Sequence, residues 1–241
     1  MQVKTKGIVL HQVKYSDSSN IVNIYTQQFG RMTFMVRGIN RKKSSLRTAL
    51  LQPLSVVEID FMHHAKNNMH HLREIRVVQP FFDIPFNPVK VSLAMFLVEI
   101  LHKILHHAEK DEYLYGFLEK SVFDLDKCDQ GLANFHLYFL IQLSNQLGFF
   151  PNNEEMELCK YFDLQNGVFT QNTPSHKQFL QNEDVLDFKV LLDLELENLE
   201  SLRLSKTRRS ELLNGIIEYY KLHLPDFKSL NSLEVLHNLW N

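Results

Sequence analysis

The side chains best suited to chemistry are six cations that lie close together early in the chain. They are Arg31, Arg37, Arg41, Lys42, Lys43 and Arg47. Phosphate groups repel one another and need cations beside them, and Gly38, Ser44 and Ser45 would let a backbone approach this segment closely. We therefore predict that these six residues bind the backbone of a nucleic acid. The alternative is a loop of merely solvated charges.

The charge of the chain is divided unevenly along its length. Residues 1–80 carry 12 Lys and Arg against 4 Asp and Glu, a balance of +8, and the remainder carries 14 against 24, a balance of −10, which sum to the net charge of −2. A basic segment on an otherwise acidic chain is typical of a protein that binds a polyanion. Nucleic acid is one such partner. An acidic protein, which would make the chain an adaptor, is another, and chance is the third reading.

Histidines offer the other candidate chemistry, because the chain holds 12 of them. His63-His64 and His70-His71 fall on neighbouring predicted strands, so a cross-strand pair could meet. His102 and His106 are four residues apart on a predicted helix, which is the spacing of two zinc ligands. Neither group has a nearby glutamate or a third ligand, so we interpret them as polar edge residues and predict no metal. A metal-dependent hydrolase built on these histidines is the enzymatic alternative.

The rest of the sequence shows no catalytic motif. Its eight glycines form no phosphate-binding loop, dinucleotide-binding loop or nucleophile elbow, so we predict a non-enzymatic protein without a cofactor. Cys128 and Cys159 are too few for a disulfide framework or a four-cysteine zinc site. The start lacks the apolar core of a signal peptide, and charged residues interrupt the most apolar stretch, residues 89–104. We therefore expect a cytoplasmic protein.

Five strands are predicted in the first eighty residues, at 7–10, 20–26, 31–37, 55–62 and 69–78. The third strand alternates cleanly, with one face made of Met32, Phe34 and Val36 and the other made of Arg31, Thr33 and Arg37. The first face predicts a barrel core and the second a cationic surface. Five strands in so short a segment favour an OB-fold, a small barrel that binds nucleic acids. Tyr15 or Tyr25 could stack bases on it.

A segment with three prolines, residues 80–88, marks the change from strands to helices. We predict a nucleic-acid-binding barrel at 1–80 and a helical domain at 81–241, with helices at 89–108, 111–125, 131–147, 184–204, 206–223 and 230–239. Asn87 and Ser205 are the expected caps of two of them. An irregular insert at about 149–183 contains two extended stretches around a turn at Gln165-Asn166. The predicted fold class is therefore α+β: an N-terminal OB-fold barrel followed by an all-helical C-terminal domain with a small irregular insert.

Residues 202–220 are the one cationic stretch of the acidic part. An apolar stripe runs along it, made of Leu212, Leu213, Ile216 and Ile217. We interpret the stripe as core and place Arg208 and Arg209 in solvent. A groove for an acidic peptide with an apolar tip is the alternative.

A series of short motifs follows one order along the chain. They are Gly7 to Leu10, Tyr15 to Val22, Tyr25-Thr26, Phe29-Gly30, Arg37-Gly38, Lys43-Ser44, Leu51 to Leu54 and, late in the chain, Tyr220 to Leu236. In this order, and followed by a helical remainder, they resemble the RecO family of bacterial recombination mediators. The resemblance extends from end to end of the chain.

The resemblance implies both a fold and a function. It implies an N-terminal OB-fold, binding of single- and double-stranded DNA, and annealing of complementary strands without nucleotide hydrolysis. It also implies partnership with RecR and with the C-terminal tail of single-stranded-DNA-binding protein, loading of RecA onto coated strands, and a place at the nucleoid. Many members hold a four-cysteine zinc site in the helical part. The corresponding insert here keeps only Cys159, so we predict no zinc.

Overall fold

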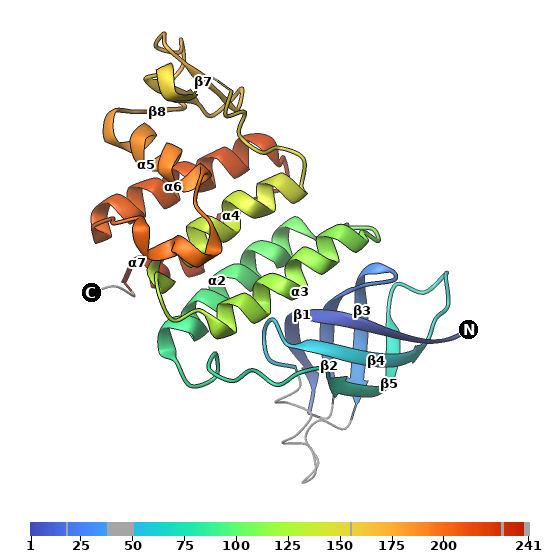
Figure 1. The fold of residues 1–241 in the computed structure, drawn as a ribbon. Coiled ribbons are helices and arrows are strands. Elements are labelled where there is room, and N and C mark those ends of the chain that lie inside the picture. Colours follow the sequence, from blue (N-terminus) through green and yellow to red (C-terminus); the bar gives the residue numbers. More distant parts are fainter. Residues whose placement is uncertain (18, 38–50, 155, 228, 239–241) are drawn as a thin grey trace. The chain divides into compact units, whose positions relative to one another are not determined.

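The computed structural model describes residues 1–17, 19–37, 51–154, 156–227 and 229–238. It divides into two compact units, Met1–Lys127 and Cys128–Asn241, each of which is described by itself (Figure 1). Four of the predicted site residues, Arg41, Lys42, Lys43 and Arg47, lie outside the described residues.

Five strands form a closed barrel in the first unit, in the order β1-β2-β3-β5-β4 (Figure 1). Their bounds are β1 Gln2–Ser16, β2 Ser19–Thr26, β3 Gly30–Arg37, β4 Val56–Met62 and β5 His70–Val77. Neighbouring strands are antiparallel except β3 and β5, which are parallel. The barrel is the OB-fold that the sequence predicted. The predicted first strand was too short, because only residues 7–10 of β1 form a continuous apolar run.

The barrel interior is filled by the alternate side chains of these strands. The core residues on the strands are Val3, Val9, Val22, Ile24, Phe34, Val36, Val57, Ile59 and Phe61, and Leu51, which precedes β4, joins them. Phe34 and Val36 of β3 therefore face inward, as the alternation of this strand predicted. Gly30 begins β3 with a φ of +66°, and a Cβ there would lie 2.4 Å from the carbonyl oxygen of Ala108. Only glycine fits this turn, because both its conformation and its contact exclude a side chain.

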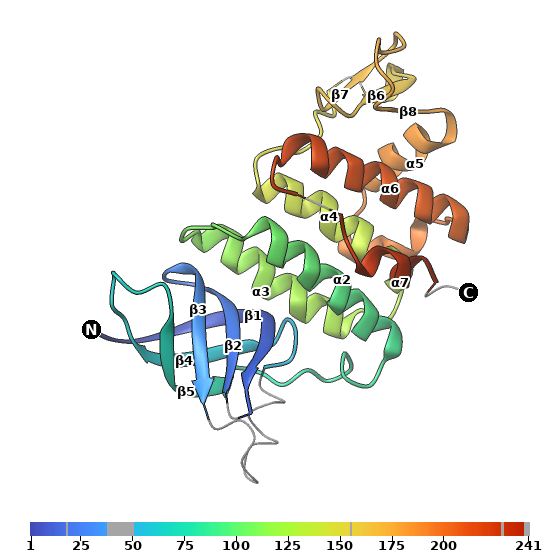
Figure 2. The same ribbon diagram turned by 180° about the vertical axis from the view of Figure 1, so that it is seen from behind.

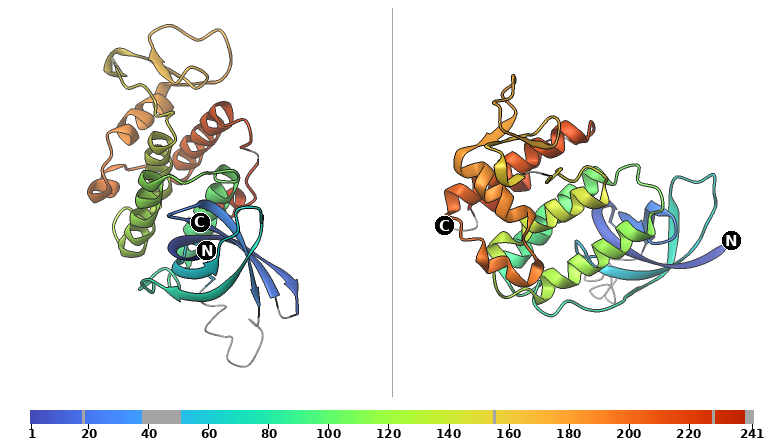
Figure 3. Two further views of the ribbon diagram at one scale, coloured as in Figure 1. Left: turned by 90° about the vertical axis from the view of Figure 1, so that its right-hand side faces the viewer. Right: turned by 45° about the horizontal axis from the view of Figure 1, so that its top comes forward.

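Two helices, α2 (Pro88–Ile104) and α3 (Glu112–Lys127), complete the first unit and lie side by side (Figures 1 and 3). The predicted cap of α2 is confirmed, because the side-chain oxygen of Asn87 accepts hydrogen bonds from Val89 N and Lys90 N at 3.1 and 3.4 Å. The change from strand to helix lies between Val77 and Pro88. The compact unit extends beyond it to the end of α3. The division into domains at residue 80 stays a prediction.

The second unit contains α4 (Phe135–Gln146), α5 (Asn182–Leu192), α6 (Lys206–His223) and α7 (Ser232–Asn238). Its insert holds a small sheet in the order β7-β6-β8, with β6 Tyr161–Asp163, β7 Val168–Thr170 and β8 Phe179–Gln181 (Figure 2). The first two strands are the extended stretches expected around the Gln165-Asn166 turn. The third strand was not predicted.

The predicted helix at 184–204 is wrong in its second half. Helix α5 ends at Leu192, and a 3-10 segment, Leu196–Ser201, follows it. The leucines of this stretch keep a helical spacing, but the side-chain amide of Asn134 donates to the carbonyl oxygens of Leu199 and Leu202 at 2.8 and 2.7 Å. A contact distant in sequence therefore occupies two carbonyl groups that a continuous helix would need.

Helix α6 begins as predicted, with the hydroxyl of Ser205 accepting a hydrogen bond from Arg208 N at 3.3 Å. Its apolar stripe is buried, so the stripe is core and not a peptide groove. The placement of the two arginines in solvent was wrong. Arg208 pairs with Asp187 at 2.5 Å and also with Glu183. Arg209 donates to the side-chain oxygen of Asn134 at 3.1 Å, and burial lowers its pKa.

Candidate nucleic-acid interface

Strands β1, β2 and β3 lie side by side in the barrel (Figure 2). The cations predicted on a strand, Arg31 and Arg37, occupy positions of β3 that alternate with its core residues, so they belong to the outer face, the side away from the barrel core. The inward positions of β2 and β3 hold core residues such as Val22 and Phe34. Since successive side chains of a strand point to opposite sides, the register aligns the outward ones into rows. One row crosses four strands and consists of Val13, Ile21, Met35 and His71.

Three of its four members, Val13, Ile21 and Met35, are apolar, so it is called here the apolar row, and it is accessible to solvent. Val13 and His71 are exposed, and Ile21 and Met35 are half-buried. The adjacent row contains Asn23 of β2 and Thr33 of β3 and is polar. A hydrogen bond fixes these two side chains, because the Thr33 hydroxyl donates to the side-chain oxygen of Asn23 at 2.9 Å. Apolar side chains open to solvent on a basic barrel offer contact area to the flat faces of bases.

Arg37 lies in the row on the other side of the apolar row. It is the last residue of β3, is exposed, and stands opposite Ser19 of β2. Ser19 also faces Ser16 at the end of β1, so the exposed Lys14 and Tyr15 lie at the same end of the barrel. Lys14 forms an exposed ion pair with Asp17 at 3.2 Å, which is worth little in water and exchanges easily. Cationic and aromatic groups therefore gather where β3 leads into the basic segment.

Arg31 is separated from this end of the barrel. It precedes Arg37 by six residues on the same strand, which corresponds to roughly 20 Å. Its guanidinium donates to the carbonyl oxygen of His102 on α2 at 2.8 Å and lies 3.4 Å from the Nδ1 atom of the same residue. Burial lowers the pKa of Arg31. The arrangement joins β3 to α2, which no local sequence pattern indicates.

Two histidines surround this arginine. The ring of His11 on β1 lies 4.5 Å from the ring of His102, measured between centroids. Burial, and next the charge of Arg31, lowers the pKa of His102 to about 4, and the same two causes lower the pKa of His11. Both imidazoles are therefore neutral at neutral pH. They act here as packing groups beside a fixed positive charge.

The predicted cross-strand histidine pair does meet. The rings of His63 and His70 stack with centroids 5.3 Å apart and planes 4° from parallel, and Phe29 stacks on the other side of His63 at 4.6 Å. His70 is buried, its Nε2 lies 3.2 Å from the carbonyl oxygen of His64, and burial lowers its pKa. The stacked pair packs the connection between β4 and β5 against the core residue Phe61.

The other predicted pair does not converge on one point. His102 contacts Arg31 and His11, whereas the ring of His106 contacts that of His107 at 3.0 Å between nitrogens. In the part of the chain that the structure describes, no three His, Cys, Asp or Glu residues gather as metal ligands.

The two tyrosines considered for base stacking differ. Tyr25 is buried, stacks on Tyr115 with centroids 6.4 Å apart, and donates to the carbonyl oxygen of Glu109 at 3.4 Å. Burial raises its pKa to about 12. The proposal that Tyr25 stacks bases was wrong, because α3 covers this outward position. Tyr15 is exposed and stays a candidate.

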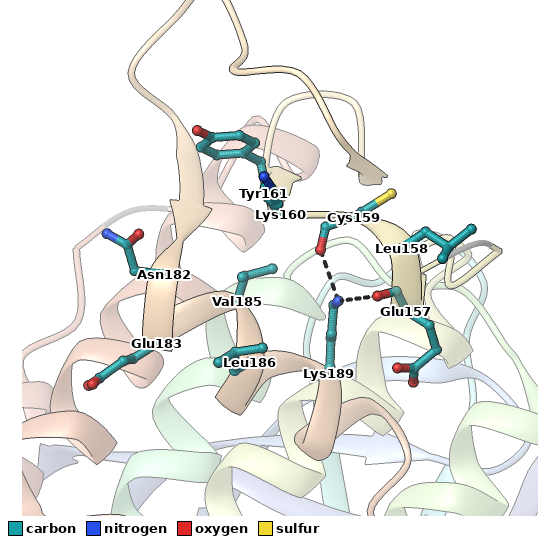
Figure 4. Close-up of a pocket in the computed structure, with 10 residues that line it drawn as sticks. All are labelled: Glu157, Leu158, Cys159, Lys160, Tyr161, Asn182, Glu183, Val185, Leu186 and Lys189. Carbon is teal, nitrogen blue, oxygen red and sulfur yellow. Dashed lines mark hydrogen bonds between the residues drawn. The ribbon is translucent and has the colours of Figure 1, made fainter.

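The second unit contains a hollow of about 560 Å³ between β6 and α5, shown in Figure 4. Leu158 and Leu186 are exposed on its walls. The buried ammonium of Lys189 donates to the carbonyl oxygens of Cys159 and Glu157 at 2.9 and 3.4 Å (Figure 4). Among the described residues no carboxylate pairs with Lys189. An ammonium has three donors, so one remains for an acceptor in the hollow.

Comparisons with known proteins agree across both units. A family model described as Recombination protein O N terminal matches residues 1–81, and one described as Recombination protein O C terminal matches residues 85–233. DNA repair protein RecO of Phocaeicola vulgatus is 39% identical over 241 residues, and that of Bacteroides fragilis is 37% identical over 242 residues. DNA repair protein RecO of Flavobacterium psychrophilum is 36% identical over 243 residues. Each alignment covers 100% of both chains.

The barrel and these relatives together identify a DNA repair protein built on an OB-fold barrel. The chain belongs to the RecO family. No helix among the described residues is long and apolar enough to cross a membrane.

The residues that the sequence reasoning missed are those of the apolar row. Val13, Ile21 and Met35 come from three strands and acquire a common role only through the strand register. The outward positions of Ile21 and Met35 could have been found from the alternation of their strands, because each neighbours a core residue. The pairing that aligns them could not.

Proposed function

We propose that this protein binds single- and double-stranded DNA and anneals complementary strands without catalysing a covalent step. The observation that carries the proposal is the exposed apolar row of the barrel beside Arg37, at the point where the chain enters its most basic segment. The balance of +8 in residues 1–80 supports a polyanionic ligand. The family supports DNA as that ligand.

The proposal assigns backbone contact to Arg37 and to the four cations that follow it, Arg41, Lys42, Lys43 and Arg47. Arg31 was predicted in the same set. Its contact with His102 favours a positioning role instead, in which it holds β3 against α2. Bases would lie against the apolar row, since phosphate contacts position a strand while apolar groups contact its bases.

Annealing follows from charge neutralisation. Two strands approach only when their phosphate charges are compensated, and a basic surface supplies that compensation without moving electrons or protons. No nucleophile, general base or nucleotide is needed for pairing to proceed. The proposal therefore describes a mediator and not an enzyme, working in the cytoplasm at the nucleoid.

The family resemblance extends the proposal to partners. We propose that the protein acts with RecR and helps load RecA onto single strands coated by single-stranded-DNA-binding protein. We propose that the hollow of the second unit binds the C-terminal tail of single-stranded-DNA-binding protein. Its walls expose Leu158 and Leu186, and the buried ammonium of Lys189 has a donor left for a carboxylate. An apolar residue that ends in a free carboxylate fits both features.

Two alternatives lead to different results. An adaptor would use the basic barrel to bind an acidic protein and would leave DNA unbound. A histidine-based hydrolase would need metal for activity, and no three His, Cys, Asp or Glu side chains gather as ligands among the described residues.

Strand annealing tests the proposal. We expect the triple variant R41E/K42E/K43E to anneal complementary oligonucleotides at least tenfold more slowly than the unaltered protein. The matched control is K110E/K120E/K127E, which makes the same change of net charge around α3 and should anneal normally. Equal annealing by all three proteins would overturn the assignment of the basic segment, and failure of the unaltered protein to bind DNA would favour the adaptor.

A further inference from the structure

The connection between β5 and α2 carries two phenylalanines whose side chains are exposed to solvent. Phe82 is 88% exposed and Phe86 is 80% exposed. Soluble proteins rarely leave large aromatic rings so open unless something binds them. Val78, at the start of the same connection, is also exposed.

The backbone that carries these rings is rigidly held. The carboxylate of Asp126 on α3 accepts hydrogen bonds from three consecutive amides, Phe82 N at 2.8 Å, Asp83 N at 3.0 Å and Ile84 N at 2.9 Å. The buried ammonium of Lys90 donates to the carbonyl oxygen of Asp126 at 2.7 Å and pairs with Asp83 at 2.8 Å. Ile84, which lies between these two phenylalanines in the sequence, is buried. The rings are therefore presented by a fixed frame, which lowers the entropy cost of binding.

The ligand must offer flat, uncharged surface at this point. Between Val77 and Val89 the only charged residue is Asp83, and its charge is paired with Lys90. The two rings expose roughly 300 Å², well below the ~800 Å² per partner that a stable protein interface buries. A nucleic-acid base fits these limits, because it stacks on a single ring through an uncharged face.

The phosphates of such a ligand need cations, and β5, the strand that leads into this connection, carries two. Arg73 and Arg76 are exposed on the strand that ends just before the connection. Arg76 pairs with Glu74 at 2.7 Å in an exposed position, where a phosphate can replace the carboxylate. Arg73 makes no ion pair with any residue that the structure describes. On the barrel, β5 lies beside β3, with His71 next to Met35 of the apolar row.

We propose that Phe82 and Phe86 are base-stacking residues of a second single-stranded DNA subsite, which continues from the outer face of the barrel across β5. This inference rests on the proposed function, because it extends a DNA path that begins at the apolar row. The subsite requires unpaired bases. It therefore distinguishes single strands from duplexes, which the cations alone do not.

Fluorescence anisotropy of a labelled oligothymidine, titrated with the full chain, tests the subsite. We expect F82A/F86A to bind the single strand about 10- to 100-fold more weakly, with an unchanged dependence on salt, because no phosphate contact is removed. Binding to duplex DNA should be unaffected. The matched control is Tyr113→Ala, since Tyr113 is also 88% exposed but lies at the start of α3.

A second variant tests stacking directly. Phe82→Trp should keep the affinity and gain a fluorescence signal that oligothymidine quenches, which is measured against the unaltered chain with its single tryptophan. Unchanged single-strand affinity of F82A/F86A, with no quenching in Phe82→Trp, would overturn the subsite while leaving the proposed function intact. If F82A/F86A instead lost binding only to a purified protein partner, the rings would be a protein-docking site and the inference would be wrong. If the unaltered chain bound no DNA, the proposed function itself would fail.

Discussion

Removal of the Asp126 carboxylate should destabilise the first unit more than removal of any exposed carboxylate. This one side chain receives three amide N–H groups from residues 82–84. Asp126 itself is buried, and the buried ammonium of Lys90 lies beside it. In Asp126→Ala three amide donors lose their acceptor, whereas the hydrogen bond from Lys90 to the backbone carbonyl at position 126 and its ion pair with Asp83 can remain.

The magnitude follows from these contacts. A hydrogen bond to a charged group contributes about 1.5–3 kcal/mol. Water can replace part of the loss at Phe82 and Asp83, because neither residue is buried. We therefore expect the free energy of unfolding of the first unit to fall by about 2–4 kcal/mol, a large fraction of the stability of a typical domain.

Urea unfolding and hydrogen exchange measure the effect. The unfolding midpoint of the first unit should fall by about 1–2 M urea, and the amides of residues 82–84 should exchange faster. Glu112→Ala is the matched control, because it also removes one carboxylate of α3, but from an exposed pair with Lys110. Equal midpoints for Asp126→Ala and Glu112→Ala, with unchanged exchange at residues 82–84, would refute the reasoning.

Three further predictions concern single side chains. His102 has a pKa of about 4 in the fold and near 6.5 when unfolded, so the unfolded chain takes up the proton first as the pH falls from 6.5 to 4 and stability is lost in that window. His102→Gln should flatten the stability curve there, and an unchanged slope between pH 7 and pH 5 would contradict this. Arg31→Met should lower the stability of the first unit by about 1–2 kcal/mol and leave the salt dependence of DNA binding unchanged. Arg37→Met should leave the stability of the first unit unchanged and weaken the salt dependence of DNA binding. Identical behaviour of the two variants would show that the structure does not separate their roles. Asn134→Ala should lower the stability of the second unit by about 2–3 kcal/mol, because the buried carbonyl groups of Leu199 and Leu202 lose their donor. The exposed Asn172→Ala is its control, and equal unfolding midpoints would count against this account.

The sequence predicted the barrel and the orientation of β3 because both depend on local alternation. A period of two places Phe34 and Val36 inside and Arg37 outside whatever the neighbouring strands do. The caps Asn87 and Ser205 were equally local, since each side chain bonds an amide two or three residues away. Such features need no knowledge of the tertiary fold.

Three of the errors share one cause, which is contact between segments distant in sequence. Tyr25 has an outward position on β2 and would be open if α3 did not cover it with Tyr115. Arg31 has the same outward orientation as Arg37, but α2 provides a carbonyl acceptor for it. The helix predicted at 184–204 ends early because the side-chain amide of Asn134 donates a hydrogen bond to the carbonyl oxygen of Leu199. None of these partners lies within fifty residues of the side chain or carbonyl it contacts.

The hollow beside Lys189 could not be predicted from the sequence either. Lysine on a charged helix suggests a solvated side chain, whereas the structure buries its ammonium against two carbonyl oxygens from a neighbouring segment. The sequence likewise does not indicate that Leu158 and Leu186 line the same hollow.

The most direct test of the central claim is the affinity for an oligothymidine measured over a range of salt concentrations. Contacts from Arg37, Arg41, Lys42, Lys43 and Arg47 predict that the logarithm of the association constant falls linearly with the logarithm of salt, with a slope of about −3.5. Arg37→Met should reduce that slope by about 0.7. A slope near zero, or no binding at low salt, would contradict the account that this barrel binds DNA through its basic end.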